Sequence, residues 1–227
     1  MSDIFQATAQ QEYQRAATQL NGSNDAKAAL EKSYQRYDKI IAKTFDESAS
    51  TAACKAGCGF CCYYKVEARA HEVLLVRDYI LKHFSAEKAA ATIENLTANA
   101  ALIRRLTPEQ HLVTNLKCAL LDNNQCSVYR ARPFRCRNFH STDAQACEAS
   151  FNDPADMTIA TGMMEAVAIL ADAHTQGFEA AAEQAGRDSR TYDFTTALLE
   201  ALTDEQVTKR HQRGKKTFQN AIEVASG

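Results

Sequence analysis

Eight cysteines are the residues whose type and spacing could do chemistry in this sequence. The first four lie within nine positions and the second four within thirty, so both groups are dense. Their members are Cys54, Cys58, Cys61 and Cys62, followed by Cys118, Cys126, Cys136 and Cys147. Deprotonated thiols bind zinc and iron, and spacings of two or three residues let one turn present several sulfurs to one ion. Gly57 and Gly59 would let the backbone wrap closely around that ion.

The start of the chain bears on the redox state of these thiols. Residues Met1 to Gln6 have neither the basic start nor the apolar run of a secretory signal, and no stretch of the chain is apolar over the length needed to cross a bilayer. We therefore expect a cytoplasmic protein, in which thiols stay reduced. This favours metal binding over disulfides, and the density of the cysteines favours it over eight unrelated buried thiols.

The identity of the metal stays open at this point. Zinc and iron–sulfur clusters both accept four thiolates, so the cofactor is either zinc or an iron–sulfur cluster. The adjacent Cys61 and Cys62 cannot easily face one ion, which leaves two four-cysteine sites or one site with reserve thiols. His140 could replace a cysteine as ligand, although a surface or core role is favoured for it.

Charged and aromatic side chains surround the cysteines in the sequence. Arg132, Arg135 and Arg137 flank Cys136, and their charge would offset that of a thiolate-bound metal. Tyr63 and Tyr64 follow Cys62, where they would either shield the metal from water or pack in the core.

A competing hypothesis starts from the spacing Cys54-x₃-Cys58-x₂-Cys61 with the aromatic Phe60, which is the cluster motif of radical S-adenosylmethionine enzymes. Those enzymes are parallel β/α barrels with the motif after the first strand. Here predicted helices precede the motif, no series of apolar strands follows it, and the second cysteine group is unexplained. The hypothesis is therefore the weaker one.

Helical periodicity dominates the elements that must position the cysteines. Apolar residues recur at helical spacing from Phe5 to Leu20, from Leu30 to Phe45, from Val73 to Phe84 and from Ile93 to Leu106. The turn residues Asn21 to Asn24 separate the first two helices, and the small polar stretch from Ser48 to Ala53 leads into the cysteines. Ser85 is a predicted helix cap, and Thr107-Pro108-Glu109-Gln110 is a predicted capping box.

The second half of the chain predicts loops followed by helices. Leu116 to Asn152 lacks periodicity, and a long helix is expected from Asp153-Pro154, through Met163 and Met164 in the core, to Gly177. Further helices are expected from Tyr192 to Leu202 and from Glu205 onward, and a strand-like piece from Tyr63 to Ala68. These elements predict a mainly α protein, a single compact helical domain with an irregular, metal-pinned, cysteine-rich core. We expect a helical extension at 1–53, a metal-binding part at 54–150 and C-terminal helices at 151–227 packed on it.

Composition excludes several partners. With a formal net charge of −2, 45% hydrophobic and 24% charged residues, the chain predicts neither a nucleic-acid nor a membrane partner. The basic run from Lys209 to Lys216 is interpreted as a solvated helix face. Glu67, Arg69, His71 and Glu72 could act as acid–base groups, but a solvated helix start is favoured for them.

Taken together, the two cysteine groups resemble the YkgJ-type CxxCxxCC cysteine-cluster proteins, described as a putative zinc- or iron-chelating domain. The resemblance covers Cys54 to Cys147 and includes the segment Cys126-x-Val128-Tyr129-x-x-Arg132-Pro133-x-x-Cys136-Arg137. One extra residue between Cys54 and Cys58 departs from the family pattern. The resemblance implies that the eight cysteines bind metal.

Three functions are compatible with these observations. The first is a metal-binding protein of unspecified role, in which Cys58, Cys61, Cys126 and Cys136 are the surest ligands. The second is an iron–sulfur enzyme for methyl transfer or redox chemistry, since one branch of the family resembles the flagellin lysine methylases. The third is metal storage or delivery. The sequence assigns no catalytic residue and no protein partner.

Overall fold

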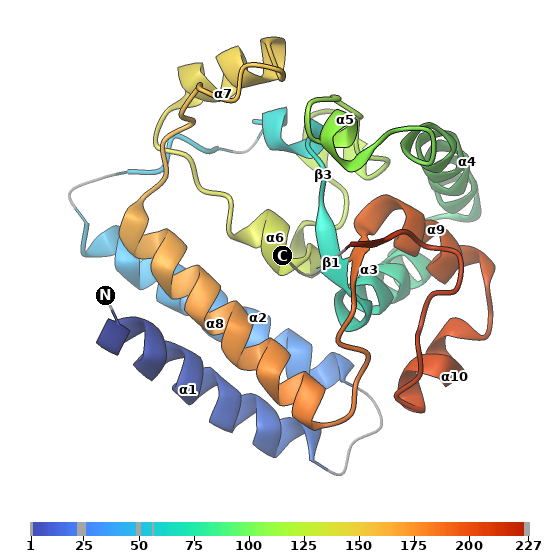
Figure 1. Ribbon diagram of the computed structural model, residues 1–227, viewed down its shortest axis with the longest axis horizontal. Helices are drawn as coiled ribbons and strands as arrows, with labels where there is room; N and C mark the ends of the chain where they lie inside the picture. Colours follow the sequence, from blue (N-terminus) through green and yellow to red (C-terminus); the bar gives the residue numbers. More distant parts are fainter. Residues whose placement is uncertain (1, 22–25, 49–50, 56, 225–227) are drawn as a thin grey trace.

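In the computed structural model, which describes residues 2–21, 26–48, 51–55 and 57–224, three long helices lie side by side (Figure 1). They are α1 (Ser2–Leu20), α2 (Lys27–Asp46) and α8 (Glu165–Gln184). The predicted stripe on α2 is buried at Leu30, Tyr34, Tyr37 and Ile41, which confirms that helix. The break expected at Asn21–Asn24 and the stretch at Ser48–Ala53 fall partly outside the described residues.

Gly177 lets α1 and α8 approach each other closely. A Cβ atom at this position would overlap the carbonyl oxygen of Ala9, so only glycine fits here. The prediction that α8 ends at Gly177 was wrong, because the glycine is a packing residue inside the helix and not a terminator.

A second group of helices covers the other side of the molecule (Figure 1). It consists of α3 (Ala70–His83), α4 (Ala86–Ile103), α9 (Phe194–Thr203) and α10 (Val207–Gln212). The predicted cap of α4 is confirmed, since Ser85 accepts a hydrogen bond from the Lys88 N–H. The predicted capping box is also confirmed, although the helix it starts, α5 (Pro108–Leu112), is a short one.

Two small antiparallel sheets join these helices. One has the strand order β1 (Glu67–Arg69), β4 (Thr191–Asp193), β5 (Glu223–Val224), with Ala68 opposite Tyr192 and Tyr192 opposite Glu223. The other is a hairpin of β2 (Leu121–Asp122) and β3 (Gln125–Cys126). The strand expected at Tyr63 to Ala68 begins later than predicted, because Phe60–Tyr63 form a 3₁₀ turn, η1. Three-residue strands carry too little alternation to be predicted individually.

The segment around Pro154 departs most from expectation. The nine-residue helix α7 (Ala144–Asn152) lies in the region predicted to be irregular, and Asp143 caps it by accepting the Ala146 N–H. The helix expected from Asp153-Pro154 was wrong, since α8 begins only at Glu165. Ser141 instead holds part of residues 153–164. Its hydroxyl donates a hydrogen bond to the Thr161 carbonyl, and its backbone pairs with that of Met163 in an isolated antiparallel β-bridge.

Other predicted positions are corrected in detail. Met163 is exposed and not in the core, whereas Met164 is buried as predicted. Tyr192 belongs to β4, so α9 starts at Phe194, and α10 starts at Val207 instead of Glu205.

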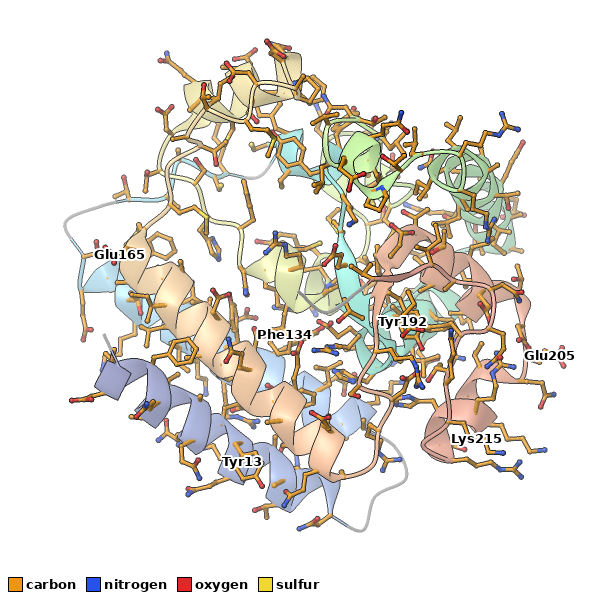
Figure 2. All side chains as sticks on the ribbon, in the orientation of Figure 1. Tyr13, Phe134, Glu165, Tyr192, Glu205 and Lys215 are labelled. Carbon is orange, nitrogen blue, oxygen red and sulfur yellow. The ribbon has the colours of Figure 1, made fainter. Side chains whose placement is uncertain are left out.

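The short helix α6 (Phe134–Arg137) lies between the two helix groups, and its first residue enters the core. The Phe134 ring lies 4.8 Å from that of Tyr34, 5.9 Å from that of His174 and 6.1 Å from that of Phe178, at the centre of Figure 2. The prediction of a mainly helical, single compact domain is confirmed. The three-part division at residues 53 and 150 stays a prediction.

Helices of the described part of the chain are too short or too polar to cross a membrane.

A buried polar cluster joins α1, α2 and α8. The Ser33 hydroxyl donates to Glu12 Oε1 over 2.7 Å and lies 2.9 Å from Nε2 of His174. Arg36 Nε donates to the other oxygen of Glu12 over 2.6 Å. Because the Ser33 proton is used by Glu12, we infer that the His174 imidazole is neutral and donates from Nε2.

We predict that this histidine makes the fold sensitive to acid. Burial lowers the pKa of His174 from 6.5 to about 4. Between these values the unfolded chain binds a proton that the folded chain does not, so stability is lost as the pH falls from 6.5 to 4. From pH 7 to pH 4 the wild type should lose about 3 kcal/mol more unfolding free energy than His174→Gln.

Urea denaturation at a series of pH values measures this difference. Gln keeps an N–H donor for Ser33 but does not titrate. His83→Gln, at an exposed position on α3, is the control and should follow the wild type. A His174→Gln variant with the same pH dependence as the wild type would contradict the account.

Candidate metal centre

The cysteines lie in several separate segments of the chain. Cys54, Cys58, Cys61 and Cys62 lie in and before η1; Cys118 precedes the hairpin; Cys126 ends β3; Cys136 is in α6; Cys147 is in α7. All eight are free thiols, seven partly buried and Cys147 buried. Residue 56, inside the first cysteine segment, is outside the described part of the chain.

Cys61 lies among thiols from all of these segments. Burial raises the pKa of five thiols, and in each of them the charge of Cys61 raises it further; the five are Cys54, Cys118, Cys126, Cys136 and Cys147. The pKa of Cys61 itself is raised most by a hydrogen bond with the thiol of Cys62, and then by burial. Cys61 therefore lies within the range of electrostatic interaction with these five thiols.

The same couplings define two sets of thiols around Cys61. In the first, Cys58 and Cys147 add to the effect of burial on the pKa of Cys54. In the second, burial holds the pKa of Cys136 well above its usual range, and the charges of Cys118 and Cys126 raise it further. Each set combines sulfurs that are distant in the sequence.

Backbone hydrogen bonds fix the first cysteine segment to the others. The Cys118 N–H donates to the Cys62 carbonyl over 2.8 Å, and the Ala53 N–H donates to the Ser141 carbonyl over 2.8 Å. The Ser141 N–H in turn donates to the Cys54 sulfur over 3.3 Å. These hydrogen bonds hold the first cysteine segment between Cys118, which precedes the hairpin, and Ser141, which precedes α7.

Aromatic contacts hold α7 and its cysteine against η1. The Phe151 ring lies 5.5 Å from that of Phe60 and 4.8 Å from that of Tyr63. The hydroxyl of Tyr64 donates to Ser150 Oγ over 3.3 Å. Tyr63 and Tyr64 thus join the cysteine segment to α7. The His140 ring packs at 5.4 Å against Phe45, and burial lowers its pKa.

Arg137 ties α6 to the helical frame. Only 2% of this residue is exposed. Its guanidinium donates to the carbonyls of Arg130 and Arg132 and, over 2.7 and 3.0 Å, to both oxygens of Asp38 on α2. The guanidinium carbon also lies 4.0 Å from the centre of the Tyr34 ring. Arg137 therefore links the turn that carries Cys136 both to the carbonyls just before that turn and to α2.

Glu72 and His71 are buried, at 3% and 4% exposure, so the favoured prediction of a solvated helix start was wrong for both. The Glu72 carboxylate accepts the Phe134 N–H over 2.7 Å and the Arg69 N–H over 2.9 Å. Sequence reasoning missed this role because Glu72 and Phe134 are 62 positions apart. The only local signal was the capping position of Glu72 at the start of α3.

Two of the three predicted arginines face the thiols. Burial raises the pKa of Cys126, and the charges of Arg132 and Arg137 lower it. Arg132 also stacks on the Tyr129 ring, 3.6 Å from its centre. Arg135 is exposed. Positive charge thus lies where thiolates would form.

The donor set fits a thiolate-bound metal in kind, since zinc and iron both bind cysteine sulfur. Among residues 2–21, 26–48, 51–55 and 57–224, no three Cys, His, Asp or Glu side chains already form a group that could hold an ion. The thiols of the described residues therefore form no coordination shell as they stand, and a metal bound by several of them would have to draw them together.

We predict that Arg137→Lys loosens the turn around Cys136. Lysine keeps the charge but lacks the planar fork that reaches two carbonyls and a carboxylate. The variant should lose about 3 kcal/mol of unfolding free energy, and Cys136 should react faster with an alkylating reagent. Arg135→Lys, at an exposed position of the same turn, should change neither quantity; equal effects of both variants would contradict the assignment.

Comparison with known proteins gives one family match. Residues 53–157 match the model of the CxxCxxCC family, a putative zinc- or iron-chelating domain. No curated protein and no solved structure matches the chain significantly. The matched range contains all eight cysteines, Glu72 and Arg137, whereas α1, α2 and α8 lie outside it. The part of the chain that carries the cysteines thus matches the family that the resemblance predicted.

Proposed function

We propose that this protein binds zinc or an iron–sulfur centre through its clustered cysteines, and that the helices outside the CxxCxxCC domain serve to hold that centre in place. The observation that carries the proposal is the contact between segments that carry cysteines: the Cys118 N–H donates to the Cys62 carbonyl over 2.8 Å, and the Ser141 N–H donates to the Cys54 sulfur over 3.3 Å. The Phe151 ring of α7 also packs 4.8 Å from that of Tyr63. Thiols with no shared function have no reason to lie on so many elements that are held together.

The raised pKa of these thiols, which burial and mutual charge explain, means that several thiolates are unstable side by side without a cation. A metal ion supplies that charge, displaces the thiol protons and links the segments, so its binding stabilises the fold. The chain's own contribution is to place the sulfurs and to set Arg132 and Arg137 beside them.

The two sets of thiols around Cys61 favour two coupled groups of ligands over a single isolated one. Cys54, Cys58 and Cys147 would belong to one group, and Cys118, Cys126 and Cys136 to the other. Cys61 and Cys62, whose thiols are hydrogen-bonded, lie where the groups meet. Adjacent cysteines suit this position because their side chains can serve different ions.

Metal storage or delivery is a narrower form of the same proposal. Seven of the eight thiols are only partly buried, which would let a chelator or a partner protein reach the metal. Rapid, complete transfer to a chelator without unfolding would favour delivery, whereas release only on unfolding would favour a structural centre. The iron–sulfur enzyme hypothesis instead requires binding of a cofactor such as S-adenosylmethionine, which calorimetric titration of the anaerobic, metal-loaded protein tests.

We predict stoichiometric metal in protein purified without oxygen or an affinity tag. Elemental analysis, acid-labile sulfide and the absorption spectrum measure it. Iron with near-equal sulfide and a brown chromophore identifies a cluster; colourless protein with zinc and no sulfide identifies a zinc site. Protein that is folded and reduced, yet neither contains nor takes up metal, would contradict the proposal.

Cys61→Ser should lose most of the metal and unfold at a lower temperature, because Cys61 lies between the two sets. Cys58→Ser should also lose metal and stability, through the first set alone. Ser127→Ala, beside Cys126, is the control for local disturbance and should keep its metal. Full metal content and an unchanged melting temperature in Cys61→Ser would show that Cys61 is not a ligand of the metal centre.

A further inference from the structure

We propose that Glu72 is a positioning residue of the metal centre: its buried carboxylate holds the Phe134 N–H and thereby sets where the following turn presents Cys136. This inference rests on the proposed metal-binding function. It adds a residue that is not a ligand and that belongs to α3, a helix outside the α1–α2–α8 group that packs against α2.

The carboxylate joins three elements by accepting from three donors. Oε1 accepts the Phe134 N–H of α6 over 2.7 Å and the Tyr34 hydroxyl of α2 over 3.2 Å. Oε2 accepts the Arg69 N–H at the start of its own helix over 2.9 Å. The two backbone N–H partners can only donate, and they bond different oxygens of Glu72. An amide, with a single oxygen, cannot accept from both in the same way.

The contact with Phe134 matters for Cys136 because α6 is a single turn. The Phe134 N–H is the first in that turn and has no acceptor within the helix. Glu72 supplies that acceptor two residues before Cys136, while the Phe134 ring is fixed in the core (Figure 2). Arg137 holds the other end of the turn, so the two residues together leave the Cys136 backbone little freedom.

The charge state of Glu72 makes the contact depend on pH. Burial raises the pKa of Glu72 from 4.5 to about 7, the charge of Glu179 on α8 adds to the increase, and the hydrogen bonds from Arg69, Phe134 and Tyr34 lower it. Of the charges that face it, Glu179 is paired with the Arg69 guanidinium over 2.9 Å. Because the three hydrogen bonds favour the carboxylate, they are weaker once it is protonated below pH 7.

The test is the rate at which the metal-loaded full chain loses its metal to excess EDTA, measured from pH 5.5 to 8.5. Glu72→Gln keeps the shape but places an amide N–H among three donors. At pH 8 it should release metal roughly tenfold faster than the wild type, a factor typical of residues that support metal ligands. Release should accelerate below pH 7 in both proteins, because the thiol ligands are protonated, but the rise should be steeper in the wild type, where Glu72 is also protonated.

Two controls separate positioning from general destabilisation. Tyr34→Phe removes one donor to the same carboxylate but leaves Phe134 in place, so its release rate at pH 8 should stay near that of the wild type. Glu94→Gln, at an exposed position on α4, should match the wild type at every pH. If Glu72→Gln does not fold, Glu72→Asp decides, because it keeps the carboxylate but moves it away from the Phe134 N–H: faster release at pH 8 supports the positioning role, and the wild-type rate overturns it.

The outcomes are distinct for the two proposals. Metal-loaded Glu72→Gln with the wild-type rate and pH profile, or a wild type whose rise below pH 7 is no steeper than that of the variant, overturns the positioning role and leaves metal binding intact. Protein that binds no metal refutes the proposed function, and the alkylation rate of Cys136 relative to Cys147 then tests positioning directly. A faster relative rate in Glu72→Gln supports the role, and an equal rate overturns it.

Discussion

A buried guanidinium must satisfy its N–H donors, and the rest of the structure around the cysteines depends on how Arg137 does so. With 2% of the residue exposed, water cannot supply the acceptors. They come from two carbonyls of the turn before α6 and from Asp38 on α2. This arrangement is possible only when α2 and the cysteine turn are in contact, so the burial of Arg137 couples the long helices to the cysteine segment.

The helices outside residues 53–157, the range that matches the family, support the turn that carries Cys136. A turn as short as α6 cannot hold its own conformation, since it has few internal hydrogen bonds. Phe134 inserts among aromatic rings from α2 and α8, and Glu72 on α3 accepts its N–H. The frame thus places Cys136 before any metal is present, while α7 is held over η1 by Phe151. Preorganisation of this kind lowers the ordering cost that metal binding would otherwise have to offset.

Sequence reasoning succeeded where the signal is local. The caps at Ser85 and Thr107, the apolar stripe of α2 and the cysteine spacing all act within a few residues, and each was confirmed or matched by the family. It failed where a contact with a residue far away in the sequence determines the role of a side chain. Gly177 was predicted to end a helix, but α1 packs against it inside α8. Glu72 was predicted to lie on a solvated helix start, but its carboxylate accepts the Phe134 N–H of α6. Pro154 suggested a helix start, although Ser141 holds that segment in an irregular path.

The most direct measurement is X-ray absorption at the metal edge of the anaerobically purified protein, because it reports the ligand atoms themselves. The account predicts a first shell of sulfur at about 2.3 Å, which weakens in Cys61→Ser and is disordered in Arg137→Lys. A first shell of nitrogen or oxygen at about 2.0–2.1 Å, unchanged when cysteines are replaced, would contradict the claim that the clustered thiols hold the metal.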